Sequence, residues 1–154
     1  MGLFRFAGCG LGLTIALVLT VGVVTLIGYL RDDPGRNPAP AAYRTAVCAA
    51  FDQLSQGTRA LERGVQDDNA AGREMAARAV ERHVAAANDA LTDLPVWEPG
   101  RSLDELLGSQ IITLINGAGS LTDGAAAQDL AVALEIETSG REQLSTGRYG
   151  FDCS

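Results

Sequence analysis

The sequence predicts an all-α protein in which a single N-terminal transmembrane helix is followed by a four-helix up-down bundle. The first observation behind this is an uncharged apolar run from Phe6 to Leu30. The second is the spacing of apolar residues after Ala41, which recur at steps of three, four and seven, as on one face of an amphipathic helix. The third is that no stretch alternates steadily between apolar and polar residues, so strands are not expected.

The apolar run lies between Arg5 and Arg31 and contains no charged residue. A helix of about 24 residues rises roughly 36 Å, which exceeds the ~30 Å hydrocarbon core of a bilayer. We therefore expect a signal-anchor helix at 6–30, preceded by a short cytoplasmic tail at 1–5.

Two other interpretations of this run stay open. A cleaved signal peptide has a shorter apolar core, and its cleavage site comes soon after that core, whereas Ala39-Pro40-Ala41 lies well past the run. A bacterial lipoprotein carries its modified cysteine after the apolar core, whereas Cys9 precedes it. Both patterns fit the chain less well than an uncleaved anchor.

The flanking charges do not fix the orientation of the predicted span. Arg5 precedes it, whereas Arg31, Arg36 and Arg44 follow it, so the positive-inside rule alone favours an external N-terminus. A short tail before an apolar segment is the layout of an anchor that exports the domain behind it, and the cysteines of the domain also favour export. We expect a single-pass protein of the cell membrane with a cytoplasmic N-terminus and an extracytoplasmic C-terminal domain.

Small residues recur every four positions in the first half of the run, at Gly8, Gly12 and Ala16. This spacing lets two membrane helices approach closely, so it predicts a homodimer through the membrane helix. The alternative is that small residues are simply common in such spans.

Residues 31–41 form a Pro-rich linker, and 42–154 form one domain. The prolines prevent helix continuation and favour an extended chain. The whole chain carries a net charge of −7 and residues 1–41 contribute +1, so the domain carries −8. This charge excludes nucleic acid and anionic lipid headgroups as partners, because both are negatively charged.

The first two helices of the domain are predicted from their apolar stripes. The first stripe contains Tyr43, Val47, Phe51, Leu54, Leu61 and Val65. Asp67, Asp68 and Asn69 supply capping oxygens for the second helix, and Pro95 ends it. The second stripe contains Met75, Ala79, Val80, Val84, Ala87, Leu91 and Leu94.

The third helix is predicted to open with a capping box, in which Ser102 and Glu105 satisfy each other's backbone donors. Thr122-Asp123-Gly124 should end this helix and cap the fourth, which Thr138-Ser139-Gly140 should interrupt. The predicted core residues of these two helices are Leu103, Leu106, Leu107, Ile111, Leu114, Ile115, Ala118, Leu121, Leu130, Leu134 and Leu144.

Cys48 and Cys153 are predicted to form a disulfide. In a bundle with an even number of antiparallel helices, the start of the first helix and the end of the last lie at the same end. Such a bridge persists only in an oxidising compartment. The alternative is two unrelated free thiols.

The sequence offers little chemistry. His83 is the only histidine, which excludes paired-histidine zinc sites and helical di-iron sites, and we expect it to pack at an interface or face solvent. Gly117 and Gly119 resemble part of a phosphate loop, but they follow a helix and the chain contains no lysine. We expect them to allow close packing or to bend the third helix. No catalytic residue, metal site or cofactor is predicted.

Trp97, in a Pro-flanked loop, is the candidate for a partner contact, because tryptophan is favoured at binding hot spots. The alternative is that Val96 and Trp97 close the open end of the bundle.

These observations predict an extracytoplasmic protein-interaction or structural module that is held at the membrane and is not an enzyme. A ligand-binding or sensory bundle that works through a membrane partner is the alternative.

Overall fold

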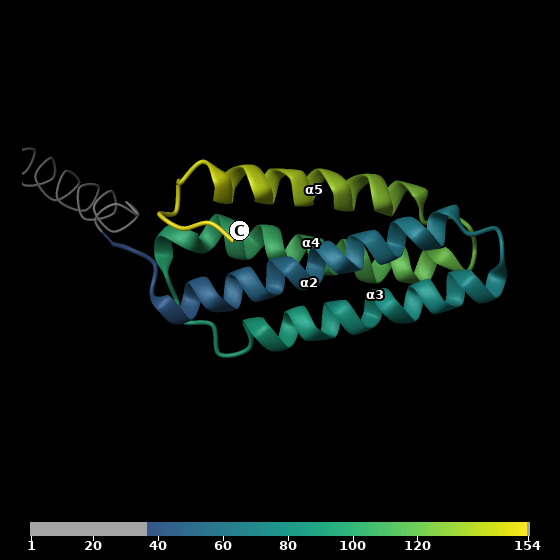
Figure 1. Cartoon of the computed structure of the whole chain (residues 1–154), viewed down its shortest axis with the longest axis horizontal. Helices are drawn as coiled ribbons and strands as arrows, with labels where there is room; N and C mark the ends of the chain where they lie inside the picture. Colours follow the sequence, from purple (N-terminus) through teal and green to yellow (C-terminus); the bar gives the residue numbers. More distant parts are fainter. Residues whose placement is uncertain (1–36, 154) are drawn as a thin grey trace, which may run out of the picture.

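The computed structural model describes residues 37–153, which form four α-helices and one short 3-10 helix and contain no strand. Successive helices run in opposite directions and pack side by side, and short turns join them (Figure 1). The predicted all-α class with four helices in the domain is therefore confirmed. The elements are α2 (Ala41–Gln66), α3 (Ala70–Leu91), η1 (Glu98–Gly100), α4 (Arg101–Leu121) and α5 (Ala127–Ser145).

The predicted membrane segment at 6–30, with Gly8, Gly12 and Ala16, lies outside the described residues. None of the helices in the described part of the chain is both long and apolar enough to cross a membrane.

The first two helices begin where their flanking residues predict. Pro40 directly precedes α2, in the extended conformation of a residue that cannot continue a helix backwards. At the start of α3, the Asn69 side chain accepts a hydrogen bond from the amide of Ala71 at 3.0 Å. The predicted capping role of this segment is therefore confirmed.

The predicted capping box at Ser102 and Glu105 is wrong. The 3-10 helix η1 leads directly into α4, whose N-cap is Gly100, so Ser102 already lies in the first turn. The amide of Gly100 donates to the carbonyl of Trp97 at 2.9 Å, which removes one of the donors that a side-chain cap would satisfy. The hydroxyl of Ser102 lies instead 2.7 Å from the hydroxyl of Tyr149.

The break after α4 is confirmed, because the chain turns at Gly124, whose φ is +71°. The cap that Thr122-Asp123-Gly124 should provide is absent, since α5 starts after Ala126 without a side-chain cap. The predicted interruption at 138–140 is also wrong, because α5 runs unbroken to Ser145. A Cβ at Gly140 would lie 2.7 Å from Cε2 of Phe51, so this glycine admits the Phe51 ring.

The core lies between α2, α3 and α4, and α5 adds few buried side chains. Three residues predicted to be in the core, Met75, Ile115 and Leu134, are instead exposed. On α5 the inward positions belong to small residues such as Ala133 and Gly140. Predicted core residues that are buried include Tyr43, Val47, Phe51, Leu54, Leu61, Val80, Val84, Ala87, Leu103, Leu107, Leu114, Ala118, Leu121 and Leu144.

Glycines set the close approach of the first three helices. A Cβ at Gly64 of α2 would lie 2.7 Å from Cβ of Ala76 on α3. A Cβ at Gly117 of α4 would lie 2.7 Å from Cδ2 of Leu61. The expected packing role of Gly117 is therefore confirmed, whereas Gly119 faces open space.

Candidate functional site

An aromatic cluster closes the end of the bundle at which α2 begins. The rings of Tyr43 and Trp97 lie 5.0 Å apart in an edge-on arrangement, and Tyr149 lies 6.0 Å from Trp97. Phe151 completes the cluster, 6.3 Å from Tyr43. The cluster joins α2, the loop between α3 and α4, and the C-terminal tail.

Trp97 fills the centre of this cluster. Its side chain is 3% exposed, and its indole N–H donates to the backbone carbonyl of Asn37 at 2.9 Å. Trp97 therefore closes this end of the bundle, whereas Val96, which was expected to share that role, is 88% exposed. A partner would meet almost no exposed indole surface at this position, which disfavours the interpretation of Trp97 as a partner contact.

Tyr43 links the cluster to α4 through a polar contact. Its hydroxyl donates to Oδ1 of Asp104 at 2.6 Å and lies 3.2 Å from the carbonyl oxygen of Gly100. Burial and the neighbouring Asp104 raise the pKa of Tyr43 well above its usual value, so the hydroxyl keeps its proton. Burial also raises the pKa of Asp104, against the opposite effect of the hydrogen bond from Tyr43. The pair joins α2 to α4.

The cysteine pair is joined as predicted. The sulfur atoms of Cys48 and Cys153 lie 2.06 Å apart, the distance of a disulfide, across 105 positions of sequence. The bond ties the C-terminal tail to α2, and Figure 1 shows this tail folding back along the bundle.

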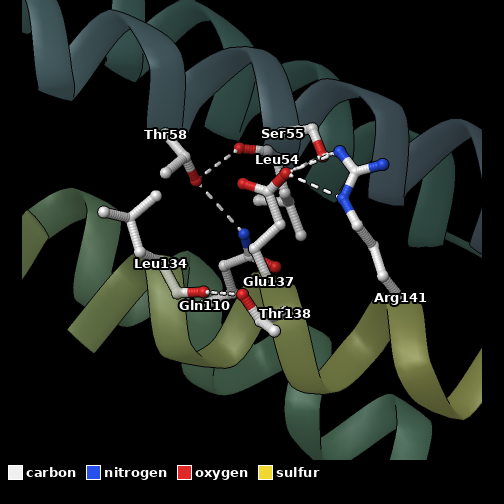
Figure 2. Close-up of polar contacts among 8 residues, drawn as sticks. All are labelled: Leu54, Ser55, Thr58, Gln110, Leu134, Glu137, Thr138 and Arg141. Carbon is white, nitrogen blue, oxygen red and sulfur yellow. Dashed lines mark hydrogen bonds and ion pairs between the residues drawn. The ribbon is translucent and has the colours of Figure 1, made fainter. Parts of the chain in front are cut away.

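A polar network connects α5 to α2. The hydroxyl of Ser55 donates to Oε1 of Glu137 at 2.9 Å, and Nη2 of Arg141 donates to the same oxygen at 2.7 Å (Figure 2). Between α4 and α2, Nε2 of Gln110 donates to the hydroxyl of Thr58 at 3.3 Å. The Ser55, Glu137 and Arg141 contacts add to the packing of the Phe51 ring over Gly140 between α2 and α5.

An open groove of about 590 Å³ runs beside this network and the disulfide. Its lining mixes apolar and charged groups, and includes Phe51, Arg141, Leu144 and Cys153. The Phe51 ring, with the Arg141 guanidinium 5.7 Å from its centroid, closes the inner wall. The groove therefore lies between α2, α5 and the C-terminal tail.

The outer face of α4, defined here as Gly108, Ile112, Ile115 and Gly119, is the surface that sequence reasoning missed. The steps of four, three and four place these residues in one stripe of the helix. Ile112 is 61% exposed and Ile115 is 53% exposed. A Cβ at Gly108 or Gly119 would meet no atom within 4 Å.

The signal for this face was available in the sequence. From Leu106 to Thr122 the chain contains no charged residue, although the domain around it is strongly acidic. A solvent-facing helix usually carries charged residues on its exposed side. Because α4 carries apolar residues on both its inner and its outer side, the sequence pattern places Ile115 in the core together with Leu114, although only Leu114 is buried.

His83 lies between α3 and α2, as expected for an interface position. Its Nδ1 atom is 3.0 Å from Oε1 of Gln53. It lines an open pocket of about 440 Å³ together with Gln56, Arg59, Glu62 and Arg63 of α2.

No three potential ligand side chains from histidine, cysteine, aspartate or glutamate gather at one place in the range 37–153. The chain matches no protein-family model, no curated protein and no solved structure in the comparisons made.

Proposed function

We propose that residues 42–154 act as an extracytoplasmic protein-interaction or structural module, held at the cell membrane by the N-terminal helix. The observation that carries the proposal is the outer face of α4. Exposed isoleucines at the centre of an uncharged stripe are unusual on a domain with a net charge of −8. The proposal assigns no enzymatic reaction and no cofactor.

The chemistry of this face indicates what kind of partner it fits. Charged groups on a partner would lose water here without gaining an opposite charge, so an uncharged apolar helix is the matching surface. Gly108 and Gly119 leave room on either side of the two isoleucines, into which side chains of such a helix fit.

Two observations support the membrane and extracytoplasmic part of the proposal. The apolar run at 6–30 has the length of a membrane span. The bond between Cys48 and Cys153 is of a kind that persists in oxidising compartments. Protease added to intact cells or spheroplasts should therefore digest the domain, and protection of the domain would reverse the proposed orientation.

Site-specific photo-crosslinking in native membranes tests the docking surface. A photo-reactive residue at Ile115 of the full-length chain should give a discrete protein adduct, and Ile112→Glu should abolish it. Met75→Glu is the matched control, because Met75 is equally exposed but lies on α3. An adduct to a second copy would identify a homodimer through this face. A folded chain that gives no adduct, or one unaffected by Ile112→Glu, would contradict the proposal.

The alternative function, a ligand-binding bundle, has one observation in its favour. The pocket at His83 carries two arginines that form no ion pair with any carboxylate of the described chain.

A further inference from the structure

The pocket at His83 gathers positive charge on an acidic domain. Arg59 and Arg63 lie four positions apart on α2, so their side chains share one face of that helix. The ion pairs of the described residues involve Arg78, Arg101 and Arg141 and neither of these two. Nε of Arg63 donates to the carbonyl of Arg59 at 3.3 Å, and neither guanidinium forms an ion pair with a carboxylate of the described residues.

The fold places His83 at this pocket through a close approach of α2 and α3. A Cβ at Gly57 of α2 would lie 3.6 Å from Cβ of His83, an ordinary van der Waals contact, so His83 lies directly against α2. Because an amide oxygen only accepts hydrogen bonds, the contact between Oε1 of Gln53 and Nδ1 of His83 requires the proton on Nδ1. In the neutral ring, Nε2 is then the atom that takes up a second proton.

Burial and the neighbouring arginines both favour the neutral form of the His83 ring. Partial burial lowers the pKa of His83, and Arg82, Arg63 and Arg59 lower it further. Asp52 acts in the opposite direction. Glu62 lines the same pocket and weakens its positive character. An anion placed between Arg59 and Arg63 would offset the repulsion that these two arginines exert on a proton at His83.

We propose that this pocket binds an oxyanion, either a phosphate or a carboxylate group, between Arg59 and Arg63, and that Nε2 of His83 takes up one proton from solvent when the oxyanion binds. Guanidinium groups suit both kinds of group, because their N–H donors match paired oxygens. By linkage, the protonated site binds the oxyanion more tightly than the neutral site, so affinity rises as the pH falls. The inference is independent of the outer face of α4.

The single histidine makes a direct test possible. The full-length chain with isotope-labelled histidine, in neutral detergent micelles, gives one set of ring signals to follow by NMR. Its pH titration should be compared in chloride, inorganic phosphate and succinate at equal ionic strength. A titration midpoint that moves to higher pH in phosphate or in succinate supports the proposal, and the anion that moves it further identifies the preferred group. Equal midpoints in all three salts would overturn it.

Variants separate binding from general screening. Arg59→Gln and Arg63→Gln should each weaken binding of the active anion roughly tenfold or more, since each removes a charge-assisted hydrogen bond. Glu62→Gln should strengthen binding. Arg78→Gln is the matched control, because Arg78 is an exposed arginine of α3 that does not line the pocket, and it should leave binding unchanged. Equal effects of all three arginine substitutions would mean that only net charge matters and would overturn the site.

His83→Gln tests the proton uptake separately, with binding of the active anion followed by calorimetry. Binding should persist in this variant, but its steep increase towards low pH should disappear. Since the anion also titrates, the comparison is between the two chains: a pH dependence in His83→Gln that equals that of the unsubstituted chain would overturn the role of the ring. Circular dichroism spectra that match those of the unsubstituted chain establish that each variant is folded.

Discussion

The hairpin of α2 and α3 differs from the hairpin of α4 and α5 in its net charge and in the side chains that it buries. Residues 41–91 contain six arginines and seven carboxylates, a net charge of −1, whereas residues 92–153 contain three arginines and ten carboxylates, a net charge of −7. The first hairpin packs along its whole length with glycine-assisted contacts, whereas α5 buries chiefly Ala133, Gly140 and Leu144.

This difference leads us to expect that the polar network and the disulfide contribute a larger share of the attachment of α5 than of the other helices. Helix stability in proteins comes mostly from the packing of an apolar face. The inward face of α5 is small, and its position depends on the Ser55, Glu137 and Arg141 network and on the disulfide beyond its end. We therefore expect α5 to be the first helix to open.

Removing the disulfide should have the largest effect. In the chain-entropy model, a bridge that closes a loop of about 100 residues contributes roughly 4–5 kcal/mol, so Cys48→Ala with Cys153→Ala should lower the free energy of unfolding by about that amount. Hydrogen exchange should quicken more in α5 than in α2 and α3. Denaturant unfolding measures the first effect and exchange mass spectrometry the second. Cys9→Ala is the control, since it removes a thiol but no bridge, and uniform exchange across all four helices would break the comparison.

Adding one methyl group in each hairpin comes next. Gly64→Ala would place a methyl against Cβ of Ala76, which is fixed to its backbone, so we expect a loss of about 2 kcal/mol. Gly140→Ala would place a methyl against the Phe51 ring, which can move with α5, so we expect a loss of about 1 kcal/mol or less. Thermal melts of the two variants give the ranking, and the reverse order would show that α5 is the rigid partner.

Breaking the network should cost less than Gly64→Ala and about as much as Gly140→Ala. Glu137→Ala removes the acceptor of both Ser55 and Arg141, and one such partly buried hydrogen-bonded contact is worth about 1 kcal/mol. Glu135→Ala removes an exposed carboxylate of the same helix and should change stability little. Equal losses in the two variants, measured by urea unfolding, would remove the network as a support of α5.

The smallest expected effect is a pH dependence of the free energy of unfolding that comes from His83 in the first hairpin. Since burial and nearby arginines lower the pKa of His83 in the folded protein, the unfolded chain takes up this proton first as the pH falls. The contribution of His83 to stability should therefore be lost between the ordinary histidine pKa of ~6.5 and the lower folded value. Unfolding curves of the unsubstituted chain and of His83→Gln should diverge in this range, and parallel curves would contradict the shift.

The parts of the fold that local chemistry dictates could be predicted from the sequence. Pro40 and Asn69 fix helix starts, and the apolar stripe of α2 is continuous, so the first hairpin was predicted well. The pairing of the cysteines could be inferred from the topology alone. The start of α4 and the continuity of α5 were predicted poorly, because η1 leads directly into α4 and Gly140 serves packing instead of a break.

The candidate surfaces were harder to predict, because they depend on which residues the partner helices leave uncovered. Ile115 has the character of a core residue and becomes a surface residue only because α4 is apolar on both sides. The pocket at His83 needs α2 and α3 side by side before Arg59 and Arg63 acquire a common neighbour. Tyr43 and Asp104 likewise meet only across two helices.

The aromatic cluster brings both ends of the described chain to one end of the bundle, since Asn37 bonds to Trp97 and Phe151 packs against the same ring. Domains with neighbouring termini tolerate circular permutation and insertion into other proteins. A short peptide could therefore join the two ends. The turn between α4 and α5, which contains Gly124 and lies at the opposite end of the bundle, offers a site for new chain termini (Figure 1). In such a permuted chain α5 would be synthesised first and α4 last, so these two helices would no longer form a hairpin of neighbouring segments.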